Sequence, residues 1–181
     1  MKKESLLVSL LLATVVDAAR ETKQNSTDAI CVFQVGNASG YVSFHQDLDG
    51  KNVTVHGNIT NLPQGKHGFH VHEYGDLSKG CSSTGSHYNP NKRNHGAPDV
   101  EDRHVGDLGN IEADECGVAV FNLTDHLLTL NGEHSIIGRA VVVHAGEDDL
   151  GRGGHNDSLT TGHAGGRLTC CVIGIRQKSN K

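Results

Sequence analysis

Histidines at alternate positions make His70-Val71-His72 a candidate metal-binding pair. Alternate residues of a β-strand share one face, so the two imidazoles would point the same way while Val71 points the other way. Histidine is the commonest protein metal ligand, and its neutral ring offers a nitrogen lone pair. The pair therefore predicts half of a metal site on a β-strand.

More potential ligands follow this pair, and they mix nitrogen and oxygen donors in a set that suits tetrahedral zinc. They are His87, His95, His104, Asp107 and, at the end of the apolar run 141–143, His144. Together these are too many ligands for one tetrahedral centre. Two other metal-binding families that use a His-x-His pair fit poorly. Metallo-β-lactamases place Asp-His directly after the pair, and cupins place a glutamate where this chain has Asp76.

The elements that would position these side chains are short β-strands. Stretches rich in β-branched residues alternate with turn signals such as Asp49-Gly50 and Asn131-Gly132, a pattern typical of an antiparallel sandwich or barrel. The expected strands are 30–34, 41–46, 53–60, 68–72, 119–123, 140–144 and 168–175.

Two long segments, 73–105 and 145–166, are polar and glycine-rich and have no clear periodicity. Loops of this length are uncommon in compact domains unless they are functional or disordered. Because these two contain most of the potential ligands outside the strands, we expect functional loops that something other than a hydrophobic core holds in place.

Length and charge narrow the class of protein. The 181 residues suit one domain, and the few aromatic residues (4%) with 23 glycines disfavour a helical bundle. The formal net charge of −5 argues against a nucleic-acid partner held by phosphate contacts.

The N-terminus predicts export from the cell. Residues 1–18 combine two lysines, a short apolar run and small residues before a cleavage site, which is the pattern of a secretory signal peptide, and the apolar run is too short to span a membrane. Six Asn-x-Ser/Thr sequons are candidates for glycosylation in a secreted protein. They begin at Asn25, Asn37, Asn52, Asn58, Asn122 and Asn156.

Four separated motifs closely resemble those of copper-zinc superoxide dismutases. They are His67-Gly68-Phe69-His70-Val71-His72-Glu73-Tyr74-Gly75-Asp76, His87-Tyr88-Asn89-Pro90, Arg103-His104-Val105-Gly106-Asp107-Leu108-Gly109-Asn110 and Gly162-His163-Ala164-Gly165-Gly166-Arg167-Leu168-Thr169-Cys170. The resemblance implies an all-β, immunoglobulin-like fold, an eight-stranded Greek-key barrel or sandwich with two long functional loops. The dismutase domain would cover 28–177, after an extension at 19–27 and before a tail at 178–181.

The resemblance also implies the roles of individual residues. Copper would be bound by His70, His72, His87 and His144. Zinc would be bound by His87, His95, His104 and Asp107, so that His87 bridges the two metals. Asp148 would join a copper-binding histidine to a zinc-binding one, here His70 and His95.

The implied reaction converts superoxide to oxygen and hydrogen peroxide as copper is reduced and reoxidised in turn, with His87 as the catalytic proton carrier and Arg167 as the residue that attracts the anion. Lysines that relatives carry in the second loop are replaced by Gly146, Thr160 and Thr161, which predicts weaker steering of the substrate. The resemblance implies a secreted homodimer. The alternative is a non-enzymatic copper-binding or copper-delivery protein on the same fold.

The chain has five cysteines, an odd number, so at least one of them has no disulfide partner within the chain. The resemblance pairs Cys81 with Cys170. Cys171, where relatives have glycine, would face the opposite side of its strand. Cys31 is expected to be a buried thiol and Cys116 an exposed one, and the odd number makes an intermolecular bridge conceivable.

Overall fold

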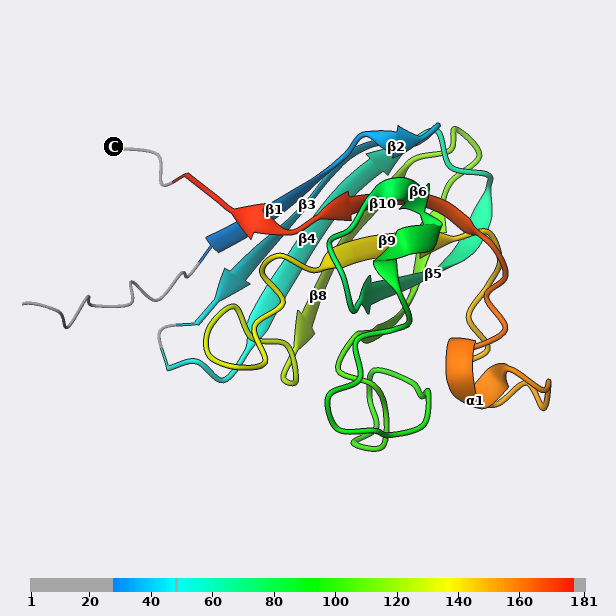
Figure 1. Cartoon of the computed structure of the whole chain (residues 1–181). Helices are drawn as coiled ribbons and strands as arrows, with labels where there is room; N and C mark the ends of the chain where they lie inside the picture. Colours follow the sequence, from blue (N-terminus) through cyan, green and yellow to red (C-terminus); the bar gives the residue numbers. More distant parts are fainter. Residues whose placement is uncertain (1–27, 48, 178–181) are drawn as a thin grey trace, which may run out of the picture.

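The computed structural model describes residues 28–47 and 49–177 and shows two antiparallel sheets packed face to face (Figure 1). The predicted signal peptide, the sequon at Asn25 and the tail at 178–181 lie outside the described residues.

The first sheet has the strand order β11-β1-β3-β4-β8. Its strands are β1 (Asp28–Phe33), β3 (Ser39–Gln46), β4 (Val53–Thr60), β8 (Ala119–Asp125) and β11 (Gly174–Ile175). Side chains alternate along them: in β4, Val53, Val55 and Ile59 are buried, whereas His56 between them is exposed. This period of two is the reason that these segments form half-buried strands.

The second sheet has the order β2-β10-β9-β5-β7 and carries the predicted metal ligands. Its strands are β2 (Val35–Gly36), β5 (Gly65–His72), β7 (Asp107–Ala113), β9 (Ala140–His144) and β10 (Arg167–Val172). All five residues of β9, Ala140 to His144, are buried. Each sheet thus has four strands of at least five residues and one of two residues, which agrees with the eight-stranded all-β expectation.

One long strand was missed by the sequence pattern. β7 begins at the potential ligand Asp107 and contains Gly109, whose φ of 74° is unusual for a strand. Its pairing with β5 shifts register between Gly68 and His70, so tertiary pairing overrides a weak local preference here.

The two expected loops join strands of the second sheet and contain short elements of their own. The first loop, between β5 and β7, includes β6 (Ser78–Cys81) and the short 3-10 helix Ser82–Thr84. The second, between β9 and β10, includes the four-residue helix α1 (Ser158–Thr161). Across the described ranges, no helix combines the length and hydropathy needed to cross a lipid bilayer.

The cysteines form two disulfides, which corrects one expectation. Cys81 in β6 is bonded to Cys170 in β10, as the resemblance implied. Cys31 is not a free thiol: it is bonded to Cys171, so that β1 of the first sheet is joined to β10 of the second. Adjacent strand residues face opposite sides, which lets Cys170 and Cys171 each reach a different partner. Cys116 is free and exposed.

Candidate metal centre

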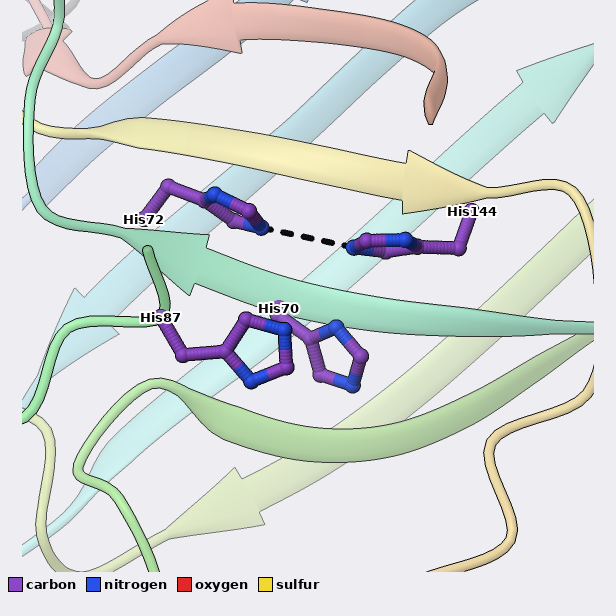
Figure 2. A group of neighbouring side chains, drawn as sticks. All are labelled: His70, His72, His87 and His144. Atoms are coloured by element: carbon purple, nitrogen blue, oxygen red, sulfur yellow. Dashed lines mark hydrogen bonds between the residues drawn. The ribbon is translucent and has the colours of Figure 1, made fainter. Parts of the chain in front are cut away.

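Four buried histidines converge beside β5 and β9 (Figure 2). They are the residues predicted for copper: His70, His72, His87 and His144. His70 and His72 lie on β5, His144 ends β9, and His87 comes from the first loop, where an isolated bridge pairs it with His72. The potential ligand atoms of these four residues all lie within 4.8 Å of one another.

The free nitrogens of this group suit a bound metal ion. His70 Nδ1 and His87 Nε2 are buried and have no hydrogen-bond partner among the described residues, and the Nε2 atoms of His72 and His144 face each other at 3.3 Å. Buried polar atoms normally have partners, because an unpaired one costs free energy. A copper ion bound by these four imidazole nitrogens would satisfy all of them.

Burial keeps these imidazoles neutral. Burial, followed by repulsion from His87, places the pKa values of both His70 and His72 well below the ordinary value. Burial also lowers the pKa of His144 to about 4. A neutral histidine offers the lone pair that a metal needs, so protons do not compete for these nitrogens near neutral pH.

A second group of ligand atoms surrounds Asp107. Its Oδ1 lies 2.8 Å from His87 Nδ1, 3.0 Å from His95 Nδ1 and 3.1 Å from His104 Nδ1. Three nitrogens and one carboxylate oxygen are a donor set that suits tetrahedral zinc. The group of ligand atoms within 4.8 Å of one another around Asp107 contains His70 and not the predicted His104. The His70 ring also lies against that of His87, with 4.0 Å between the ring centroids. His104 nevertheless lies within contact distance of Asp107.

His87 belongs to both groups. Its Nδ1 faces Asp107 at 2.8 Å, whereas its Nε2 is buried, unpaired and turned to the copper group. One imidazole with a nitrogen toward each ligand group has the geometry that a bridge between two metals requires.

Asp148 connects the two groups from the second loop. Its Oδ2 contacts His70 Nε2 and its Oδ1 contacts His95 Nε2, both at 2.8 Å. These contacts hold the pKa of Asp148 below its usual value, although burial acts in the opposite direction. Burial alone would lower the pKa of His95, but its contacts with Asp107 and Asp148 raise it to about 9. Carboxylates in such positions orient ligating imidazoles.

Three supporting residues were not assigned a role from the sequence. Asn110 accepts a hydrogen bond from the Asp148 backbone N–H at 2.7 Å and fixes the loop there. His67 lies between two carbonyl oxygens, those of Pro63 and His144, each 2.8 Å from a ring nitrogen. Gly162 approaches Asp148 so closely that a Cβ there would overlap its carboxylate. All three lie in or near the sequence motifs, but their spacing gave no sign of these contacts.

Arg167 stands at the start of β10, opposite His144 in the strand register. Its guanidinium donates hydrogen bonds to the carbonyl oxygens of Cys81 and Gly85, both at 2.6 Å, and to Thr84 Oγ1 at 3.0 Å. The cation is close enough to lower the pKa values of His72 and His144. A fixed positive charge therefore lies beside the copper group.

A family model described as copper/zinc superoxide dismutase (SODC) matches residues 38–173. The chain belongs to the copper/zinc superoxide dismutase family. The match contains both ligand groups, Asp148 and Arg167.

Several superoxide dismutases resemble the chain over most of its length. It is 49% identical to an extracellular Cu-Zn superoxide dismutase of Drosophila melanogaster, which covers 94% of this chain and 98% of the relative. It is 56% identical to Cu-Zn superoxide dismutase A of Xenopus laevis over 81% of this chain and 97% of that one. The crystal structure of the clock protein EA4 matches with a TM-score of 0.80 and 51% identity, covering 84% of this chain and 96% of that chain.

Proposed function

We propose that this chain is a secreted enzyme that converts superoxide to oxygen and hydrogen peroxide, with copper bound by His70, His72, His87 and His144. Zinc would be bound by His87, His95, His104 and Asp107. The observation that carries this proposal is the position of His87, whose two ring nitrogens face the two ligand groups separately.

Copper at this site would supply the alternating one-electron reduction and oxidation that dismutation requires, and zinc, which has no redox chemistry, would suit the group that contains the Asp107 carboxylate. His87 provides the atom through which a proton can enter the site. Its Nε2 has no hydrogen-bond partner in the part of the chain that the structure describes and would be able to hold either the metal or a proton, while Asp107 keeps the ring oriented through Nδ1.

Arg167 would attract and orient the anionic substrate. Three of its donors are used by the first loop, which fixes the guanidinium, and an arginine side chain has five N–H groups in all. The remaining donors can contact superoxide. Because Cys81 supplies one of the carbonyl oxygens and is bonded to Cys170, the disulfide also supports the position of this arginine.

The test measures superoxide consumption by the mature chain loaded with both metals, beside a His144→Ala variant. We expect rapid turnover that collapses when His144 is lost, whereas zinc content stays close to one per chain. An inactive wild type with full copper occupancy would instead favour the alternative, a copper-binding or copper-delivery protein.

We also propose that the enzyme is a homodimer. Exposed apolar side chains near the C-terminal end of the domain support this: Val172 in β10 and Ile175 in β11 are 38% and 71% exposed. Ile175 is paired with Ala29 on β1 and follows Val172 by three residues. Light scattering should report a dimer for the wild type and a monomer for Ile175→Asp. Val120→Asp, on another part of the surface, is the matched control and should stay dimeric.

Secretion is supported by the leader pattern at residues 1–18, by the two disulfides and by the similarity to the extracellular Drosophila enzyme. Expression of the full chain in eukaryotic cells should release a protein that starts at residue 19 or 20 into the medium. Retention of an uncleaved chain inside the cell would contradict this part of the proposal.

A further inference from the structure

A row of four side chains crosses the outer face of the first sheet. The strand register pairs Val32 with Tyr41, Tyr41 with Asn58 and Asn58 with Val120, on β1, β3, β4 and β8. Residues directly opposite one another in antiparallel strands share a face. Asn58 therefore lies between Tyr41 and Val120, and Val32 continues the row beyond Tyr41 (the sheet is seen in Figure 1).

The neighbours of Asn58 are apolar side chains left open to solvent. Val120 is 63% exposed and Tyr41 is 36% exposed, although both lie within regular strands. Exposed apolar groups that adjoin one another usually mark a surface that something covers. Tyr41 and Val120 therefore indicate that another group covers this part of the sheet.

Asn58 begins the sequon Asn58-Ile59-Thr60, and its side chain is partly exposed and uncommitted. Among the described residues, none forms a hydrogen bond with its amide. The sequon at Asn52 offers a contrast within the same strand hairpin, because the Asn52 amide donates to Asp47 Oδ2 at 3.4 Å.

We infer that Asn58 carries an N-linked glycan whose first sugars lie over Tyr41 and Val120. The sugar rings have apolar faces that can pack on an aromatic ring and a branched aliphatic side chain, while their hydroxyls stay in water. The inference rests on the proposed secretion, since the modification occurs on exported chains.

The covalent step transfers an oligosaccharide from a lipid-linked pyrophosphate donor. A bond forms between the Asn58 amide nitrogen and the first sugar's anomeric carbon, the bond from that carbon to the pyrophosphate oxygen breaks, and the lipid pyrophosphate leaves. The amide gives up one proton to a base of the transferase, and no group is oxidised or reduced.

The sequon at Asn122 lies on the same face but points to different neighbours. Asn122 is paired with His56, and His56 with Ser43, so it sits one row away from Asn58. A glycan at Asn122 would cover that second row. This makes Asn122 a control for the position of the glycan at Asn58.

The first experiment measures occupancy. The chain is exported from cultured eukaryotic cells, once with its own residues 1–18 and once with an unrelated secretory leader in their place. Glycopeptide mass spectrometry, with an amidase that converts glycosylated asparagine to aspartate, reads each sequon. We expect Asn58 to be converted, and both Asn58→Gln and Thr60→Val to lose one glycan. Unmodified Asn58 in the secreted protein would overturn the inference.

The unrelated leader separates this inference from the proposed secretion. If only the chain with that leader reaches the medium, the proposed secretion fails, and the state of Asn58 in that material still decides the present inference.

The second experiment measures coverage through the rate at which a tyrosine-nitrating reagent modifies Tyr41. Tyr74, 53% exposed in another part of the surface, is the internal reference. Loss of the glycan by either Asn58→Gln or Thr60→Val should raise the ratio of Tyr41 to Tyr74 nitration several-fold. Asn122→Gln should change it less, because Asn122 is paired with His56, whose ring centroid lies 6.0 Å from that of Tyr41, and not with Tyr41 itself. Equal ratios in all variants would show that the glycan does not lie over the row and would overturn that part of the inference.

Discussion

Arg103 and Asp125 form an ion pair inside the protein, with 2.5 Å between Arg103 Nη2 and Asp125 Oδ2 and both side chains buried. Arg103 Nη1 also donates to the backbone carbonyl oxygens of His104 and Asp107. The arginine therefore joins the end of β8 to the backbone of two predicted zinc ligands.

We predict that Asp125→Ala lowers the free energy of unfolding by about 3–5 kcal/mol, because it leaves a buried guanidinium without its anion. Chemical denaturation of the metal-free protein measures this. The control is Asp102→Ala, which breaks the exposed pair with Arg93 (3.6 Å) and should cost less than about 1 kcal/mol. Equal losses in the two variants would contradict the role given to the buried pair.

The disulfide between Cys31 and Cys171 should stabilise the two packed sheets independently of the one between Cys81 and Cys170. The pair Cys31 and Cys171 closes a separation of 140 residues, and a bridge of this kind typically contributes about 2–4 kcal/mol. We predict that Cys31→Ala with Cys171→Ala reduces stability by that amount while dismutase activity per bound copper persists. A parallel loss of activity would show that the bridge also supports the metal site.

Loss of the disulfide between Cys81 and Cys170 should affect catalysis through the position of Arg167. We predict that Arg167→Ala lowers kcat/KM by about tenfold or more, the lower range for electrostatic attraction of a substrate. Cys81→Ser should lower it by less, because Thr84 and Gly85 still hold the guanidinium. Rapid-mixing kinetics at matched copper content measures both. An unchanged kcat/KM in Cys81→Ser would show that the disulfide does not support the position of Arg167.

Substrate steering should depend weakly on salt. Superoxide dismutases are a standard example of electrostatic steering, but between residues 145 and 166 Arg152 is the only lysine or arginine. We predict a shallower fall of kcat/KM with ionic strength than in relatives with lysines there. Thr160→Lys should raise kcat/KM at low salt and steepen the fall, and Thr160→Glu should do the reverse. An equally steep wild-type dependence would contradict the prediction.

The metal-free protein should lose stability as the pH falls from about 6.5 to 4. In the unfolded chain histidine takes up a proton near pH 6.5, whereas burial lowers the folded pKa of His144 to about 4 and places those of His70 and His72 well below the ordinary value. The unfolded state thus binds more protons in this window, which lowers the free energy of unfolding by about 1.4 kcal/mol per pH unit for each extra proton.

Denaturation midpoints at pH 7 and 4.5 measure this, with His144→Asn as a variant whose slope should be shallower. His95, with its pKa raised to about 9, acts in another window: its contribution is complete below pH 6.5 and is lost as the pH rises toward 9. A metal-free protein equally stable at both acidic and neutral pH would contradict the assignment of neutral histidines.

Local sequence patterns predicted the strands better than they predicted contacts between residues far apart in the sequence. The alternation in β4 and the apolar run in β9 are visible in the sequence, because burial on one or both faces sets the residue types. β7 was missed because its pairing with β5, not its composition, makes it a strand. The bond between Cys31 and Cys171 was missed because cysteine spacing does not reveal connectivity.

The same limit applies to the metal centre. His-x-His on a strand indicates a half-site, but the contact of His67 with the carbonyl oxygens of Pro63 and His144 depends on how β5 and the end of β9 are brought together. The motifs supplied the ligand candidates, and the packing of the two loops supplied the residues that orient them.

The bond between Cys31 and Cys171 also sets an order for biosynthesis. Cys31 lies on the first strand of the described domain and Cys171 on its last long strand, so the bond needs nearly the whole domain to have left the ribosome. The partner of Cys81, Cys170, lies on the same late strand, so an oxidant that acts before β10 is made would pair Cys31 with Cys81. Correct oxidation therefore has to follow synthesis of β10, and the domain depends on thiols that stay reduced, or on exchange of wrong pairs, until its C-terminal strand arrives.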